Sequence, residues 1–285
     1  MFLWKRARSL EGKVAIITGA SSGIGAASAR AMARAGIDLL LVARRRDRLE
    51  EVAASVRALG RRTYVVVGDV SDASHVAMVL DEADRHFGKF DIVFSNAGYG
   101  MERPVHLMED AELRAMFEVN FFSSVALLRE SAIRLRKAHR PGHLLMCSSC
   151  LSKFSMPDHG AYAASKAAQE AICRAMRFEL ARDQIEVASV HPVTTTTEFF
   201  NSSSIRSGTK GGEVPDHAPK WLIQSPDVVA SAVVSCLRRP RSEVWTSHVV
   251  RLSSALFTAC PWILDLVLRH QAKRQRIRQG GGRSP

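Results

Sequence analysis

Cysteine is scarce in this sequence, and the cysteines that are present do not form a framework. The 285 residues hold five cysteines, an odd number scattered along the chain, which excludes a small disulfide-stapled fold. Only Cys147-Ser-Ser-Cys150 has the spacing of a redox motif. Such motifs normally open a helix of a different fold, whereas Cys147 ends an expected buried strand. We therefore interpret both residues as structural thiols, with a thiol switch as the less favoured alternative.

The sequence also lacks the patterns of an exported protein, a membrane span and a metal site. The start, Met1-Phe-Leu-Trp-Lys-Arg, lacks the apolar core of about 7–15 residues that a signal peptide needs. The apolar stretch at 252–268 is broken by Pro261 and Asp265 and falls short of the roughly 20 residues that span a bilayer. Histidines and cysteines form no cluster with metal-ligand spacing. We expect a cytoplasmic protein without a metal.

Positive charge is abundant overall but concentrated at the two ends. The net charge is +12, of which residues 1–10 carry +3 and residues 238–285 carry +8, so residues 11–237 carry +1. A nucleic-acid-binding protein more often has a basic stripe on its folded domain, and we do not expect nucleic acid as a partner. The length and a hydrophobic content of 46% suit one globular domain.

Short apolar segments alternate with helical patterns along the chain. This alternation predicts a single α/β domain of the Rossmann type, a doubly wound parallel sheet with helices on both faces. Such sheets bind ligands at the carboxyl ends of their strands. Strands are expected at 14–18, 39–43, 63–67, 92–95, 144–147 and 187–190, with clear helices at 24–35, 47–59 and 112–136.

The first expected strand runs directly into a glycine-rich turn, Thr18-Gly-Ala-Ser-Ser-Gly-Ile-Gly25. Glycines let backbone approach a pyrophosphate, and the helix that follows offers N–H groups and the positive end of its dipole. The spacing G-x-x-x-G-x-G differs from the common dinucleotide fingerprint and is a weak signal alone. Its position after the first strand predicts a dinucleotide site.

A second motif, Ser149 followed by Tyr162-x-x-x-Lys166, predicts chemistry at a carbonyl or alcohol. Tyr162 and Lys166 share one face of a helix. Free tyrosine titrates near pH ~10, and we expect the nearby ammonium to lower that pKa toward the working range. Ser149 adds a hydroxyl that can hold the substrate oxygen, and the gap to Tyr162 favours it over Ser148.

These motifs resemble those of the short-chain dehydrogenase/reductase family over residues 10–250. The asparagine at 120 matches one that the family uses to hold a proton-relay water against the lysine. The resemblance therefore implies a catalytic set of Asn120, Ser149, Tyr162 and Lys166. It also implies that coenzyme contacts come from Gly19, Ser21, Ser22, Gly23, Ile24, Gly25, Arg44, Asp69, Val70, Asn96, Ala97, Gly98, Tyr162, Lys166, Pro192, Thr195 and Thr197.

The resemblance further implies a seventh strand, expected at 243–249, and a homo-oligomer built through helices such as 112–136 and 160–182. The sequence departs from the family pattern at two positions. Ser95 replaces the first of two asparagines, and Val193 replaces the glycine after Pro192. We interpret Val193 as a change in substrate shape. It is also the one feature that favours the alternative function, a non-catalytic NADP-binding sensor or scaffold.

The second expected strand ends in Val42-Ala43-Arg44. Members of the family that prefer NAD usually have an acid there, which binds both ribose hydroxyls. A guanidinium can instead pair with a 2′-phosphate. The sequence thus predicts NADP (NADPH) as the coenzyme, with Arg44 as the main determinant. We interpret Arg46 and Arg48 as part of a solvated helix start.

Three segments outside the core pattern complete the organisation. Residues 1–9 form a short basic leader, and residues 194–221 follow the sixth strand, where the family places a substrate lid. The Ser/Thr/Gly-rich part at 194–212 is expected to be irregular. The tail, 251–285, is apolar and then basic. It either packs on the domain or on a second subunit, or lies on a membrane surface. A membrane contact would suit an apolar carbonyl or alcohol substrate at the inner face of a membrane.

Overall fold

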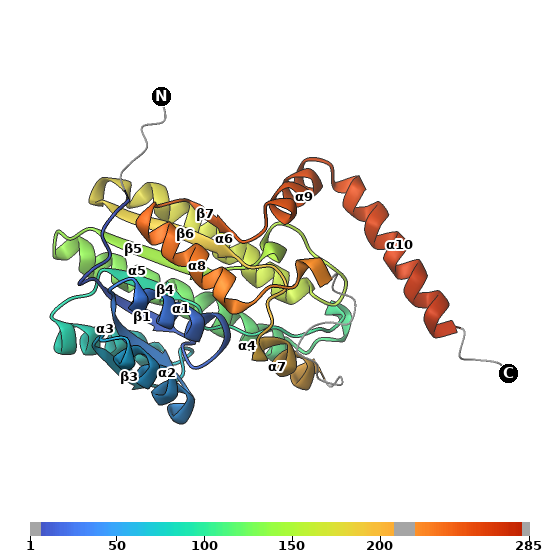
Figure 1. Cartoon of the computed structure of the whole chain (residues 1–285). Helices are drawn as coiled ribbons and strands as arrows, with labels where there is room; N and C mark the ends of the chain where they lie inside the picture. Colours follow the sequence, from blue (N-terminus) through green and yellow to red (C-terminus); the bar gives the residue numbers. More distant parts are fainter. Residues whose placement is uncertain (1–6, 208–219, 281–285) are drawn as a thin grey trace.

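A seven-stranded parallel sheet forms the centre of the protein in this computed structural model, which describes residues 7–207 and 220–280. The strand order is β3-β2-β1-β4-β5-β6-β7 (Figure 1). The winding direction changes between β1 and β4, where sheets of this kind bind ligands. The strands are β1 (Val14–Thr18), β2 (Asp38–Ala43), β3 (Thr63–Val67), β4 (Ile92–Ser95), β5 (Gly142–Cys147), β6 (Ile185–His191) and β7 (Glu243–Trp245).

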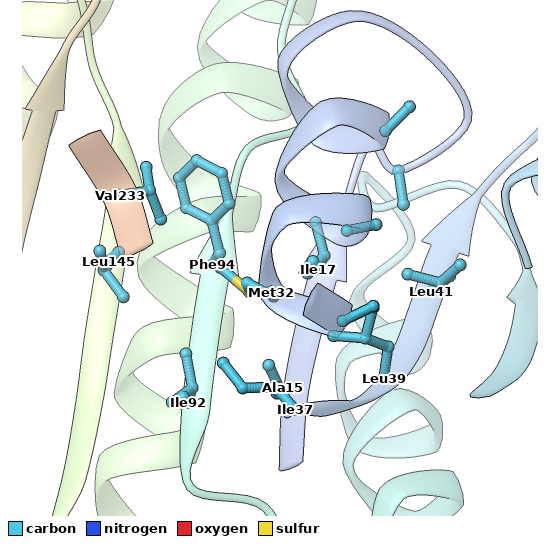
Figure 2. Close-up of a cluster of buried hydrophobic side chains, with 14 of the residues drawn as sticks. Ala15, Ile17, Met32, Ile37, Leu39, Leu41, Ile92, Phe94, Leu145 and Val233 are labelled. Carbon is cyan, nitrogen blue, oxygen red and sulfur yellow. The ribbon is translucent and has the colours of Figure 1, made fainter. Parts of the chain in front are cut away.

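Helices cover both faces of this sheet. On one face, α1 (Gly23–Arg34), α2 (Arg46–Ala58) and α8 (Pro226–Arg238) build the buried cluster shown around Met32 and Phe94 in Figure 2. On the other face, α3 (Ala73–Phe87), α5 (Ser123–Lys137) and α6 (Gly160–Glu179) build a second cluster. Because both faces are covered, β1 and β2 are buried along their whole length. The predicted doubly wound α/β fold is confirmed.

The ends of several elements differ from the prediction. β5 and β6 are longer than the predicted 144–147 and 187–190. The seventh strand is shorter than the predicted 243–249, because a helix, α9 (His248–Ala259), begins inside that range. The hydroxyl of Ser247 accepts a hydrogen bond from the backbone N–H of Val250 at 3.3 Å and thereby caps α9. The domain boundary predicted at residue 250 therefore falls inside a helix.

The segment after β6 was predicted to be irregular, but the structure has a helix there, α7 (Glu198–Ser207). The serine-rich composition suggested a loop, but the hydroxyl of Ser207 donates to the backbone carbonyl of Ser203 within the helix at 2.7 Å. The rest of the expected lid up to residue 219 lies outside the described residues. The chain continues with the short 3₁₀ turn η5 (Lys220–Leu222).

The helix predicted at 112–136 contains a π turn. It runs from α4 (Asp110–Phe117) through the π turn η2 (Glu118–Phe122) into α5. Such turns occur frequently at functional sites, and this one contains the fully buried Asn120. Further short 3₁₀ turns are η1 (Val105–Leu107), η3 (Cys150–Ser152) and η4 (Ala181–Asp183).

The tail forms an elbow of two helices, α9 and α10 (Pro261–Gly280). Phe257 of α9 packs against Phe154 with ring centroids 5.6 Å apart, whereas α10 extends away from the sheet (Figure 1). Of the helices that the structure describes, none is long and apolar enough to cross a membrane alone. Residues 248–259 and 261–270 pass that test only as a pair, bent by 109°. Residues 1–6 of the predicted leader and 281–285 of the tail lie outside the described residues.

Candidate active site

The glycine-rich turn after β1 has the backbone space that a pyrophosphate needs. Gly19 and Gly23 have φ values of +65° and +52°, which favour glycine. A Cβ atom at Gly25 would collide with the carbonyl oxygen of Gly19. Ser22 occupies the N-cap of α1, but its hydroxyl accepts a hydrogen bond from Arg45 rather than from the helix backbone. The start of α1 therefore fits an anion bound by its N–H groups.

The turn after β4 connects this glycine turn to the catalytic helix. The side-chain amide of Asn96 donates to the carbonyl of Thr18 at 3.1 Å. A Cβ atom at Gly98 would lie 3.0 Å from Oδ1 of Asn120 and 3.4 Å from Nζ of Lys166. The lack of a side chain at Gly98 is thus what allows these two side chains to approach the turn.

Opposite charges meet at the ends of β2 and β3. Arg44 and Asp69 form an ion pair at 3.3 Å, with both side chains largely exposed. Burial would raise the pKa of Asp69, but hydrogen bonds from Ser71 and the guanidinium of Arg44 hold that pKa below its usual value. The next residue, Val70, lines a small cavity with Thr18. The predicted residues at these two strand ends therefore lie at one edge of the site.

Ser149, Tyr162 and Lys166 converge at the carboxyl end of β5. The side chains of Ser149 and Tyr162 are hydrogen-bonded to each other. Nζ of Lys166 lies 5.7 Å from the centroid of the Tyr162 ring and donates to the carbonyl of Cys147 at 2.9 Å. The hydroxyl of Ser148 donates instead to the backbone carbonyl of Lys166 at 3.0 Å. Ser149 is therefore the serine that meets the tyrosine, as its spacing predicted.

Burial moves the pKa values of this tyrosine and lysine away from each other. It raises the pKa of Tyr162 above its ordinary value, although the hydrogen bond with Ser149 opposes the rise. It also lowers the pKa of Lys166 to about 8. The predicted lowering of the Tyr162 pKa by Lys166 does not occur in this structure, because Nζ is directed at the Cys147 carbonyl. At neutral pH Tyr162 is therefore a protonated phenol, which can donate a proton.

Asn120 is fixed within the π turn by hydrogen bonds in two directions. Its side-chain amide accepts from the backbone N–H of Tyr99 and donates to the carbonyl of Tyr99, both at 2.9 Å. The same amide donates to the hydroxyl of Ser165 at 3.1 Å, and the amide of Gln169 donates to the backbone carbonyl of Asn120. Asn120 thus ties the turn after β4 to α6. The proton-relay water implied by the resemblance stays a prediction.

The segment after β6 contacts both halves of the site. A Cβ atom at Gly23 would lie 3.0 Å from Cγ2 of Thr197. The ring of Phe199 lies 5.7 Å from that of Tyr162, measured between centroids. Thr195, in contrast, directs its hydroxyl to the carbonyl of Val193 at 2.8 Å. The start of α7 therefore lies over the glycine turn and beside the tyrosine, where a lid would lie.

The two residues at the end of β6 that precede this segment are packed against the serine turn. The carbonyl of Pro192 accepts a hydrogen bond from the N–H of Cys150 at 3.1 Å, directly after Ser149. Val193, which replaces the family glycine, is buried.

A buried polar network behind Ser149 escaped the sequence analysis. His191 is fully buried, with Nδ1 3.0 Å from the carbonyl oxygen of Ser149 and Nε2 3.2 Å from Oε2 of Glu170. Lys153 lies between Glu170 and Glu243, at 3.0 Å and 2.9 Å from their carboxylates. These residues come from distant parts of the chain, and no local spacing connects them.

Three members of this network could also be considered as metal ligands. Ligand atoms of Glu170, His191 and Glu243 lie within 4.8 Å of one another. The ammonium of Lys153 already contacts both carboxylates and balances their charge. We therefore interpret the cluster as an ion-pair network that supports the backbone of Ser149.

The cysteines flanking Ser149 are unreactive in this environment. Cys147 and Cys150 are free thiols, and burial raises the pKa of each to about 11. The thiolate, which is the reactive form, is therefore scarce at neutral pH. This favours the structural interpretation over a thiol switch.

A doubly wound sheet with a glycine turn and a Ser-Tyr-Lys cluster at one edge is the architecture of a nucleotide-dependent oxidoreductase, and comparison with known proteins supports that class. The model of the short chain dehydrogenase family matches residues 13–207. The chain is 31% identical over 278 residues to dehydrogenase/reductase SDR family protein 7-like of Drosophila melanogaster, covering 92% of this chain and 84% of that protein. It is 33% identical over 239 residues to an uncharacterized oxidoreductase of Mycobacterium tuberculosis, with coverages of 82% and 67%. The chain belongs to the short-chain dehydrogenase/reductase family.

Solved structures of similar proteins contain both kinds of nicotinamide coenzyme. An alcohol dehydrogenase from Thermococcus sibiricus, complexed with 5-hydroxy-NADP, is 32% identical, with a TM-score of 0.71 and coverages of 82% of this chain and 95% of that one. A short chain dehydrogenase from Mycobacterium paratuberculosis, bound to NAD, is 26% identical, with a TM-score of 0.73 and coverages of 84% and 97%. These neighbours support a nicotinamide coenzyme. Because both NAD and an NADP derivative occur among them, the preference for one form has to be inferred from the residues of this chain.

Proposed function

We propose that this protein uses NADPH to interconvert a carbonyl and an alcohol. The observation that carries the proposal is the convergence of Ser149, Tyr162 and Lys166 at the sheet edge that also holds the glycine turn. A bound nicotinamide supplies or accepts the hydride. In the reduction direction, the phenol of Tyr162 donates its proton to the substrate oxygen, and the hydroxyl of Ser149 hydrogen-bonds to the same oxygen.

The remaining members of the set support that proton transfer. By the family resemblance, Lys166, whose Nζ lies 5.7 Å from the centroid of the Tyr162 ring, holds the ribose of the nicotinamide. Asn120 holds the turn after β4 in place beside Lys166. Because burial raises the pKa of Tyr162, this side chain is protonated at neutral pH.

The direct test is spectrophotometric, with NADPH consumption followed against a panel of ketones and aldehydes. We expect turnover with at least one apolar member of the panel. Tight NADPH binding without turnover on any member would instead support the alternative, a coenzyme-binding sensor or scaffold.

The preference for NADPH is supported by cations at the end of β2. The strand ends at Ala43 and is followed by Arg44 and Arg45, so no acid of β2 faces the expected ribose position. Arg44 is largely exposed and pairs with Asp69 at 3.3 Å. Its guanidinium can therefore turn to pair with a 2′-phosphate.

We expect Arg44→Ala to lower the NADPH/NADH ratio of kcat/KM about 10- to 100-fold, because a hydrogen bond to a charged group typically contributes about 1.5–3 kcal/mol. The matched control is Arg57→Ala, since Arg57 lies on α2 and pairs with Glu50 at 3.3 Å. The control is expected to leave the ratio unchanged. An unchanged ratio in Arg44→Ala itself would contradict the assignment.

We further propose that the protein acts at a membrane surface on an apolar substrate. The tail elbow supports this, because Leu252, Trp262 and Leu266 are each more than 60% exposed. The exposed Arg269 follows these apolar side chains, with further basic residues up to 278 in the sequence. Apolar side chains can enter the headgroup region while each nearby cation adds about 1 kcal/mol on an anionic surface.

Sedimentation with anionic liposomes tests the membrane proposal on the full chain. The double variant Trp262→Glu/Leu266→Glu is expected to lower the partition coefficient about 10-fold or more, since each buried apolar side chain contributes about 1.5–3 kcal/mol. Val228→Glu on α8, where Val228 is 45% exposed, is the matched control and should pellet normally. If the unaltered chain does not pellet at low salt, the elbow is a protein-packing element.

We also propose a homo-oligomer through the faces of η2–α5 and α6. Phe122, Ile133 and Phe178 on these elements are 53%, 51% and 75% exposed, and exposed large apolar side chains are available for contact with a second copy. Sedimentation equilibrium that yields the mass of a single chain at all concentrations would contradict this proposal.

A further inference from the structure

One arginine connects the coenzyme turn to the first residue of the lid helix. Nη2 of Arg45 donates to the hydroxyl of Ser22 at 2.9 Å and to that of Ser21 at 3.3 Å. Nη1 of the same guanidinium lies 2.7 Å from Oε2 of Glu198, the first residue of α7. Arg45 therefore contacts the turn that binds the coenzyme and the helix that lies over it.

The contacts of Glu198 and of the residue before it fix the position of its carboxylate. The preceding residue, Thr197, packs against the glycine turn, since a Cβ atom at Gly23 would lie 3.0 Å from Cγ2 of Thr197. The hydrogen bond from Arg45 holds the pKa of Glu198 below its usual value, so the carboxylate is charged at neutral pH. The lid thus delivers a negative charge to the cationic edge of the coenzyme site.

The carboxylate of Glu198 pairs with the guanidinium of Arg45, which a 2′-phosphate would also contact. We propose that Glu198 is a coenzyme-specificity determinant, which competes with the 2′-phosphate of NADPH for Arg45 and weakens the binding of NADPH relative to NADH. The inference rests on the proposed NADPH preference. NADH carries a 2′-hydroxyl in place of the phosphate, so neither competition for Arg45 nor repulsion between anions applies to it.

The competition has a consequence for the lid. When the phosphate takes Arg45, the ion pair between Arg45 and Glu198 breaks, and the start of α7 keeps the contact of Thr197 with the glycine turn and that of Phe199 with the ring of Tyr162. Binding of NADPH therefore loosens the start of the lid, whereas NADH leaves the ion pair intact.

The test is an equilibrium titration of the full chain with NADPH and with NADH, followed by coenzyme fluorescence in the absence of a carbonyl substrate. Both partners of the ion pair are about half exposed, so its contribution is modest. Glu198→Gln is expected to lower the Kd for NADPH about two- to fivefold and to leave the Kd for NADH unchanged. Glu50→Gln is the matched control, because Glu50 forms a similarly exposed pair with Arg57 at 3.3 Å.

The same titrations in an Arg45→Ala background decide whether the effect passes through Arg45. In that background we expect Glu198→Gln to have no further effect on NADPH. The inference is overturned if Glu198→Gln changes both Kd values equally, leaves the NADPH value unchanged, or still tightens NADPH without Arg45. Equal affinity of the unaltered chain for the two coenzymes would contradict the NADPH preference, while selective tightening in Glu198→Gln would still support the role of Glu198.

Discussion

Replacing Tyr162 with phenylalanine is expected to lower carbonyl turnover about 10²–10⁴-fold, the range that general acid–base catalysis typically contributes. The substitution keeps the ring, which packs beside Phe199, and removes the only proton that the proposed mechanism transfers. The affinity for NADPH should stay within about twofold, because the glycine turn and Arg44 are untouched. The measurement pairs steady-state turnover with a fluorescence titration of NADPH.

A conservative control separates the chemistry from the loss of a hydroxyl in general. Tyr64→Phe removes the same group from β3, where the ring of Tyr64 stacks on His86 with centroids 3.7 Å apart. This control should retain full turnover. If Tyr162→Phe also retained near-normal turnover, the proton donor would have to lie elsewhere and the proposed mechanism would be wrong.

Glu170→Gln is expected to lower the free energy of unfolding by about 3 kcal/mol at neutral pH, because removing one partner of a buried ion pair leaves the others uncompensated. The carboxylate of Glu170 is within 3.2 Å of His191 and 3.0 Å of Lys153, and the residue is buried. Burial would raise the pKa of Glu170, but hydrogen bonds to His191 and Ser189 and the ammonium of Lys153 hold it well below the usual range.

The direction of that pKa shift fixes the pH dependence of the effect. A carboxyl group whose pKa is lowered by folding stabilises the folded state above its unfolded pKa of about 4.3. The stabilisation is lost as the pH falls through the folded value. The difference between the unaltered chain and Glu170→Gln should therefore be full at pH 7 and shrink progressively below about pH 4.

Urea unfolding at several pH values measures this difference. Glu179→Gln, at the exposed end of the same helix, is the control and should change stability by less than about 0.5 kcal/mol. A loss of comparable size in both variants, or one independent of pH, would contradict the role assigned to the network.

The sequence predicted those parts of the fold and site that depend on local spacing. The glycine turn followed the first strand directly, and the four-residue interval between Tyr162 and Lys166 placed both side chains on one helix face. The apolar run of β1 predicted a buried strand, and β1 is buried throughout. Both β1 and β3 have the predicted bounds, although β3 is only partly buried. Alternation of these runs with helical patterns was enough to predict the doubly wound sheet.

Most of the features that were missed depend on tertiary contacts. The helix α7 is different: its serine-rich composition indicated a loop, but the hydroxyl of Ser207 bonds within the helix to the backbone carbonyl of Ser203. The π turn around Asn120 depends on contacts with Tyr99 and Ser165, which have no counterpart in a hydrophobic pattern. The pKa of Tyr162 rises because of burial, and burial is decided by the packing of α6 and α7 rather than by the nearby lysine.

The short last strand has a consequence for how copies of this protein can meet. An edge strand with unpaired backbone groups is a template for aggregation, and β7 offers only three residues at this edge. Its Glu243 is engaged by Lys153, and the guanidinium of Arg177 donates to the carbonyl of Ser242 at 2.8 Å. The short length of β7 and the charged side chains beside it therefore disfavour the addition of a strand from another copy at this edge. We therefore expect any association of copies on this side to use helical surfaces.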